Sequence, residues 1–150
     1  MRVIIQRVSK ASVHIGGSVA GEIDRGFLVL LGIVDGDNQE GIDWLVGKIT
    51  KMRIFPDDGD KMNRSLTDIN GELLIVSQFT LHASTKKGNR PSFIKAARPE
   101  TAIPLYQQFL TTAEAEMGKA CASGEFGAEM QVSLVNDGPV TISMDSRARE

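Results

Sequence analysis

The chain is poor in the residue types on which several classes of protein depend. Among its 150 residues there are one cysteine, Cys121, and two histidines, His14 and His82. A disulfide within the chain is therefore excluded. A structural zinc site is not expected either, because such a site takes about four nitrogen or sulfur ligands. A single cysteine also fits a reducing compartment, and we expect a cytoplasmic protein.

Long hydrophobic runs and a strong net charge are also missing. No apolar run approaches the roughly 20 residues of a membrane-spanning helix, and residues 1–7 are too few and too charged for a signal peptide. The formal net charge is −2, which argues against a protein that binds nucleic acid without specificity. Residues 84–98 differ, because they hold five basic side chains and no acidic one. This segment could contact a few phosphates, although a charge run is more often a solvated surface loop.

What is present suits one domain over residues 1–150, which is long enough to bury a substantial core. Apolar periodicity and turn signals predict strands at both ends of the chain and two helices between them, that is, a mixed α/β domain. The expected strands cover residues 1–8, 10–15, 18–23, 27–34, 53–55, 72–81, 130–135 and 140–144. The expected helices run from a cap at Asp37 or Asn38 to about Met52, and from Pro99 to about Met117.

The most informative stretch is Ser77-Gln78-Phe79-Thr80-Leu81-His82-Ala83, which follows the apolar run 73–76. Side chains alternate between the two faces of a strand, so we expect Gln78, Thr80 and His82 to share a face. A buried strand that ends in an amide, a hydroxyl and an imidazole places polar groups where a ligand can meet them. A strand that merely surfaces into water explains the pattern equally well.

A second stretch, Gly138-Pro139, lies between two strand-like runs. Proline cannot donate to a sheet ladder, and an X-Pro bond is the main place where a cis peptide occurs. Glycine has no Cβ to cover the backbone, so the pair could present two carbonyl groups to a neighbour. A simple hairpin turn explains the same residues.

Taken together, these motifs resemble those of the D-aminoacyl-tRNA deacylases, a family of editing hydrolases. The resemblance covers nearly the whole chain. The matching segments are Met1-Arg2-Val3-Ile4-Ile5-Gln6-Arg7-Val8 with Ala11-Ser12-Val13, Leu28-Val29-Leu30-Leu31-Gly32, Lys61-Met62-Asn63, Ser77-Gln78-Phe79-Thr80-Leu81, Lys87-Gly88-Asn89-Arg90-Pro91-Ser92-Phe93, Phe126-Gly127-Ala128 and Asn136-Asp137-Gly138-Pro139-Val140-Thr141. His82 departs from the family, which more often has tyrosine at this position.

The resemblance implies a fold of mixed, barrel-like β-sheets with two main helices packed outside, and a homodimer with shared active sites. It implies hydrolysis of the ester between a D-amino acid, or mischarged glycine, and the terminal ribose of tRNA, while L-aminoacyl-tRNA is spared. A Gly-cisPro pair, here Gly138 and Pro139, is expected to reach into the pocket of the other subunit and to exclude an L side chain. No metal and no organic cofactor are implied.

Carried onto this sequence, the catalytic positions are Thr80 and Gln78. Catalysis itself is assigned largely to the 2′-hydroxyl of the substrate's own ribose, and the protein supplies positioning and hydrogen bonds near the developing oxyanion. Phe79 is equally well explained as core, and Arg7 as a surface side chain. The expected substrate contacts are Ser77, Phe79, Gly138, Pro139 and Arg7, and the expected contacts to tRNA phosphates are Lys86, Lys87 and Arg90.

Two other functions stay open at this point. The first is an RNA-binding or interaction module without catalysis, supported by the basic segment and by the lack of a standard catalytic triad. The second is a conventional hydrolase in which His82 acts as the base that activates Thr80. Turnover of D-aminoacyl-tRNA separates the enzyme from the module, and substitution of His82 tests the conventional hydrolase.

Overall fold

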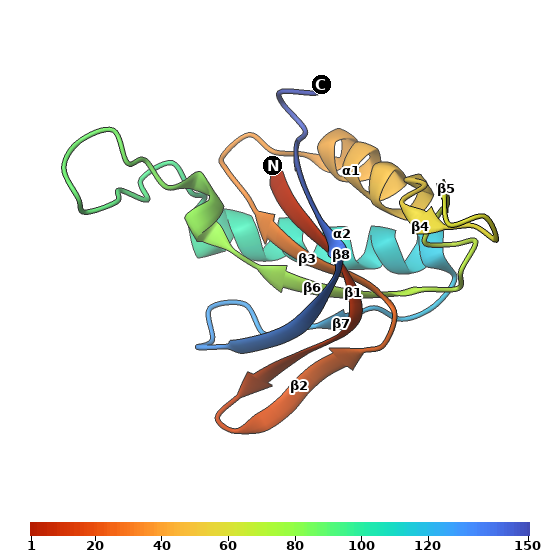
Figure 1. Cartoon of the computed structure of the whole chain (residues 1–150). Helices are drawn as coiled ribbons and strands as arrows, with labels where there is room; N and C mark the ends of the chain where they lie inside the picture. Colours follow the sequence, from red (N-terminus) through yellow and green to blue (C-terminus); the bar gives the residue numbers. More distant parts are fainter.

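The computed structural model describes residues 1–150 and is built around one six-stranded sheet (Figure 1). The sheet has the order β2-β1-β3-β6-β7, and β8 pairs with β1. Its strands are β1 (Arg2–Ile15), β2 (Ser18–Ile23), β3 (Gly26–Gly32), β6 (Glu72–Ser77), β7 (Ala122–Ser123) and β8 (Gln131–Asp145). A two-stranded sheet joins β4 (Phe55–Pro56) to β5 (Met62–Arg64). The helices are α1 (Gln39–Lys51), α2 (Pro99–Met117) and the short 3-10 helix η1 (Phe79–His82).

The long strand β1 gives the sheet its nearly closed, barrel-like curl. Residues 2–8 of β1 pair with β3, residues 11–15 pair with β2, and β8 runs along the other edge of β1. β2 thereby folds back against β6 and β7 (Figure 1). The approach is close, since a Cβ added to Gly21 would lie 2.8 Å from the carbonyl oxygen of Ser123. The expected mixed α/β, barrel-like fold is therefore confirmed.

Both helices begin at the signals that the sequence predicts and end close to the expected residues. The side chain of Asn38 accepts the N–H of Gly41 at 3.2 Å at the start of α1. Helix α2 begins at Pro99 and ends before Gly118, whose φ of 67° lies in the left-handed region that glycine adopts readily. The apolar sides of both helices pack into the main hydrophobic core together with β1, β3 and β6. A second, smaller core fills the curl of the sheet.

The two separate strands expected over residues 130–135 and 140–144 are one continuous strand, so the alternative of a simple hairpin turn at Gly138-Pro139 is wrong. β8 stays paired with β1 on both sides of this pair, and residues 137–140 bulge outward opposite the single residue Arg7. Asn136 closes the bulge locally, since its side chain accepts the N–H of Val140 at 3.2 Å. The sequence therefore carries the local chemistry of a turn, while the long edge of β1 keeps the flanking residues in one strand.

Strand β6 ends earlier than the expected range 72–81. It ends at Ser77, and the chain then tightens into η1, where the N–H of Leu81 donates to the carbonyl of Gln78 at 3.3 Å. The neighbouring strand β3 ends at Gly32, so residues beyond Ser77 have no strand to pair with. A continued strand would leave its backbone groups without partners, and the 3-10 turn supplies them.

Candidate functional site

A cleft opens at the end of β6, where the chain leaves the sheet. Its volume is about 280 Å³, and its lining is mostly apolar. The ends of β3 and β6 form one wall, the start of α2 a second, and residues 126–132 a third. Phe126 lies 6.0 Å from the ring of Tyr106 between centroids, and the Tyr106 hydroxyl donates to the carbonyl of Ile75 at 2.9 Å. The third wall is thus fixed to the main core.

Sequence reasoning does not identify this third wall as part of a site. Phe126, Gly127 and Ala128 lie in a stretch that reads as irregular, and none of them bears a chemically reactive group. The one signal that points to them is their match to a segment of the resembled family. Their role in the structure is to shape the cleft opposite Gln78 and Phe79.

Ser77 and Gln78 are the polar residues that line the cleft, and Thr80 lies next to them in η1. The side-chain amide of Gln78 donates to the hydroxyl of Thr80. Gln78 is half-buried and lines the cleft, whereas Thr80 is exposed, and neither side chain makes another hydrogen bond within the chain. Both retain capacity for a ligand, because an amide offers two donors and an acceptor, and a hydroxyl offers one donor and two acceptor sites.

His82 does not share a face with Gln78 and Thr80, so that expectation is wrong. The 3-10 turn rotates the imidazole inward, where the residue is 6% exposed and its Nε2 atom has no hydrogen-bond partner. Burial lowers the pKa of His82, and the positive charges of Arg2 and the N-terminal amine add to this effect. The hydroxyl of Thr80 is joined to Gln78 instead of His82. The structure therefore contains no threonine–histidine pair of the kind that a conventional hydrolase needs.

The basic segment leaves the body of the protein directly after η1. Figure 1 shows it as the green loop that extends furthest from the sheet. Two backbone hydrogen bonds between Ser84 and Ser92, of 2.8 and 2.9 Å, close the base of the loop. Its side chains Lys86, Lys87 and Arg90 are exposed and form no ion pair with an acidic residue. Their charges are therefore not neutralised by an acidic side chain of the chain itself.

Gly138 and Pro139 are exposed on the bulge of β8 and are fixed by Arg7, which is 8% exposed. The peptide bond between the glycine and the proline is cis. The guanidinium of Arg7 donates to the carbonyl of Asp137 at 3.1 Å and to that of Ile54 at 2.5 Å. Gly138 has a φ of 124°, and a Cβ there would lie 2.8 Å from a terminal nitrogen of Arg7. The bulge therefore requires glycine at this position.

Within one chain the two groups of expected site residues lie at opposite ends of β3. Leu31 of β3 is the register partner of Ser77, whereas Phe27 of the same strand is the partner of Arg7. Four residues of strand separate these positions, which corresponds to about 13 Å. The structure thus brings Ser77, Gln78 and Phe79 together at the cleft, with Thr80 next to them in η1, and places Arg7, Gly138 and Pro139 elsewhere.

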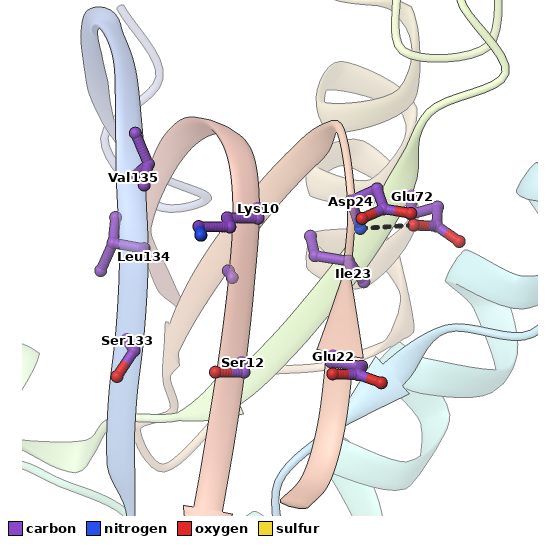
Figure 2. Close-up of a pocket in the computed structure, with 10 residues that line it drawn as sticks. Lys10, Ser12, Glu22, Ile23, Asp24, Glu72, Ser133, Leu134 and Val135 are labelled. Atoms are coloured by element: carbon purple, nitrogen blue, oxygen red, sulfur yellow. Dashed lines mark hydrogen bonds between the residues drawn. The ribbon is translucent and has the colours of Figure 1, made fainter.

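A second hollow lies on the outer face of β1, β2 and β8, and Figure 2 shows its lining. Its volume is about 620 Å³. Ser133, Ser12 and Glu22 form a row across the three strands. The hydrogen bond drawn there joins the N–H of Asp24 to a carboxylate oxygen of Glu72 at 2.7 Å. No group of three potential metal-ligating side chains occurs in this hollow or elsewhere in the chain.

No helix of the chain is long and apolar enough to cross a bilayer.

Comparison with known proteins identifies a family over nearly the whole chain. Residues 4–145 match the family model described as D-Tyr-tRNA(Tyr) deacylase. A protein of Flavobacterium johnsoniae named D-aminoacyl-tRNA deacylase is 62% identical over 150 residues, with the full length of both chains covered. A protein of Akkermansia muciniphila with the same name is 60% identical over 150 residues, again with both chains fully covered.

Two solved structures share the fold. One, described as c-Myc DNA Unwinding Element Binding Protein, aligns with a TM-score of 0.91 at 42% identity and covers 99% of this chain and 100% of its own. The other is described as a probable eukaryotic D-amino acid tRNA deacylase. It aligns with a TM-score of 0.80 at 20% identity and covers 95% of this chain and 97% of its own. At that identity the second likeness supports the fold alone.

Proposed function

The chain belongs to the D-Tyr-tRNA(Tyr) deacylase family, and we propose that it hydrolyses the ester bond of D-aminoacyl-tRNA to release free tRNA and the D-amino acid. Glycine mischarged onto tRNA is the second substrate. The observation that carries the proposal is the cleft at the end of β6, where Gln78 and Thr80 offer hydrogen-bonding groups beside an apolar pocket. The names of the full-length relatives supply the substrate class.

The chemistry that this site favours is hydrolysis assisted by the substrate. An aminoacyl ester is already activated, and the adjacent 2′-hydroxyl of the ribose can act without a nucleophile from the protein. Gln78 and Thr80 then orient the ester and donate hydrogen bonds near the developing oxyanion. The buried imidazole of His82, whose Nε2 has no hydrogen-bond partner, supports this mechanism over a protein base, because it makes no hydrogen bond with the Thr80 hydroxyl.

Selection between enantiomers requires a second chain. Enantiomers carry identical groups, so only a wall of fixed shape separates them, and a glycine substrate has no side chain for that wall to reject. Gly138 and Pro139 are exposed and anchored by Arg7, about 13 Å along the sheet from the position of Ser77. We therefore propose a homodimer in which this pair completes the cleft of the partner, and a fully active monomer by sedimentation would contradict it.

The basic loop is proposed to contact the phosphates of tRNA through Lys86, Lys87 and Arg90. Affinity for tRNA should then fall with increasing salt, because each neutralised phosphate releases counterions. The second candidate function is nucleic-acid binding without turnover. It is favoured by this loop and by the name of one structural relative, a protein described as binding a DNA unwinding element.

The deciding experiment is a discharge assay with matched D- and L-aminoacylated tRNA. Enzyme at one hundredth of the substrate concentration should discharge D-aminoacyl-tRNA and glycyl-tRNA over many turnovers and leave L-aminoacyl-tRNA charged. Gln78→Leu, which keeps the size of the side chain but removes its donors, should be much slower. Stoichiometric binding without discharge would favour the nucleic-acid-binding module instead.

A further inference from the structure

Exposed apolar side chains gather beside the cleft. Phe79 is 55% exposed, Phe93 is 38% exposed and Ile94 is 89% exposed. The rings of Phe79 and Phe93 meet edge to face, with centroids 5.2 Å apart and an interplanar angle of 79°. We call Phe79, Phe93 and Ile94 the aromatic rim. Two half-exposed phenyl rings in contact offer a surface of a kind on which nucleobases stack.

The exposure of the rim is not the consequence of a loose loop. The hydrogen bonds between Ser84 and Ser92 fix the chain just before Phe93. Just after Ile94, the N–H of Ala96 donates to the carbonyl of Phe93 at 3.0 Å, and the N–H of Ala97 donates to that of Ile33 at 2.9 Å. Backbone hydrogen bonds therefore fix the chain on both sides of Phe93 and Ile94, although both side chains are exposed to solvent.

The aromatic rim lies between the cleft and the basic loop. Phe79 lines the cleft, its ring meets Phe93, and the segment that carries Phe93 continues from the loop with Lys86, Lys87 and Arg90. A single-stranded nucleic acid that enters the cleft by its 3′ end presents groups in the same order. Its terminal nucleoside enters the pocket, the base before it meets the rim, and the phosphates meet the cations.

We propose that Phe93, together with Phe79 and Ile94, binds the base of the nucleotide that precedes the terminal adenosine of tRNA. The inference rests on the proposed function, since it takes the 3′ end of tRNA to occupy the cleft. It goes further by assigning a second nucleotide to a defined surface. Stacking of one base on aromatic side chains changes affinity by about 10-fold. The rim thereby distinguishes tRNA from a free aminoacyl nucleoside.

The test compares two substrates in the Phe93→Ala variant. One is D-aminoacyl-tRNA, and the other is the D-aminoacyl ester of adenosine, which lacks the preceding nucleotide. We expect KM for the tRNA to rise about 10-fold with little change in kcat. The loss of kcat/KM for the adenosine ester should be at least fivefold smaller than the loss for the tRNA. Phe93→Trp should restore the KM for tRNA, because it restores an aromatic face.

Two further variants guard against a loss of folding. Ile94→Ser changes a side chain that is 89% exposed and should raise KM for the tRNA in the same direction as Phe93→Ala. The control is Val19→Ala, on the far hairpin and 51% exposed, which should change neither substrate. The proposal is overturned if Phe93→Ala loses activity equally on both substrates, or on neither. It is also overturned if the wild-type protein is a dimer and Phe93→Ala is a monomer, because the rim would then be a contact with a second copy of the chain.

A binding measurement separates this proposal from the proposed function. Uncharged tRNA that carries a fluorescent cytidine analogue just before the terminal adenosine should lose fluorescence on binding, and Phe93→Ala should abolish that loss. If the wild-type protein hydrolyses neither substrate but quenches the analogue through Phe93, the catalytic proposal fails and the rim stands. If the wild-type protein binds the tRNA without quenching, the rim fails whatever the turnover.

Discussion

The cleft at the end of β6 and the bulge of β8 are built in opposite ways. At the cleft, the side chains of the half-buried Gln78 and the exposed Thr80 are linked only to each other. At the bulge, the side chain of Arg7 is buried and donates to two carbonyl groups that are 130 and 47 residues away in sequence. The cleft has unused hydrogen-bonding capacity, and the bulge has almost none. The difference teaches that the proposed catalytic groups are left available for a ligand, while the proposed chiral wall is fixed in place.

This contrast predicts where substitutions act. A change at Arg7 should be felt mainly in stability and in selectivity, because it loosens a fixed surface. A change at Thr80 should be felt mainly in rate, because the exposed hydroxyl contributes little to folding. A change at His82, the buried last residue of η1, should be felt in the pH dependence of stability.

The largest effect is expected for Arg7→Ala. The substitution leaves the carbonyls of Asp137 and Ile54 without their donor and removes the cation from the face of Phe55, which lies 6.0 Å away. We expect a loss of about 2–3 kcal/mol in the free energy of unfolding, measured by chemical denaturation. Discrimination between D- and L-aminoacyl-tRNA should fall as well, since the bulge that carries Gly138 is no longer held.

Arg25→Ala is the matched control for Arg7. Arg25 also lies over the ring of Phe55, at 5.3 Å, but it is exposed and makes no side-chain hydrogen bond. The substitution should therefore lower the free energy of unfolding by less than about 1 kcal/mol. If the two variants lose equal stability, the hydrogen bonds of Arg7 do not hold the bulge. The bulge would then be no more firmly fixed than the cleft.

A smaller effect is expected for Thr80→Val, which replaces the hydroxyl by a methyl group of similar size. The rate of discharge should fall about 10-fold, the value of one neutral hydrogen bond, while the free energy of unfolding stays within about 0.5 kcal/mol of the wild type. Thr80→Ser keeps the hydroxyl and should keep most of the rate. A loss beyond about 10⁴-fold would instead mark Thr80 as a nucleophile.

The sequence predicts those parts of the molecule that are set by neighbouring residues. The cap at Asn38 and the start of α2 at Pro99 are both local signals, and each lies where the sequence places it. The continuity of β8 is not local, because it depends on the edge of β1, whose residues on either side of the bulge, Gln6 and Val8, pair with Thr141 and Asn136. Local turn chemistry at Asn136 therefore predicts a hairpin where the sheet imposes a bulge.

The candidate site divides in the same manner. Alternation along a strand predicts one face for Gln78, Thr80 and His82, yet the end of β3 at Gly32 removes the pairing partner and turns His82 inward. Phe126 bears no chemically reactive group, so its chemistry does not predict a place at the site. Its position at the cleft is set by the tertiary structure. Sequence patterns thus find reactive groups, and tertiary structure decides which of them meet.

The smallest effect is expected for the pH dependence that His82 adds at the cleft end. Burial, together with Arg2 and the N-terminal amine, disfavours the charged imidazole, while the carboxylate of Asp37 and a backbone contact from Gly32 act in the opposite direction. The net result is a pKa below the ordinary value of 6.5 in the folded protein. Between that lower pKa and 6.5 the unfolded chain binds a proton that the folded chain does not.

Stability should therefore fall as the pH drops through 6.5 toward the folded pKa of His82, by at most about 1.4 kcal/mol per pH unit. His82→Phe fills the same space without a titrating group and should flatten this slope in denaturation curves taken between pH 7 and pH 5. A slope that survives in His82→Phe would mean that the protonation of another group sets the pH dependence of stability.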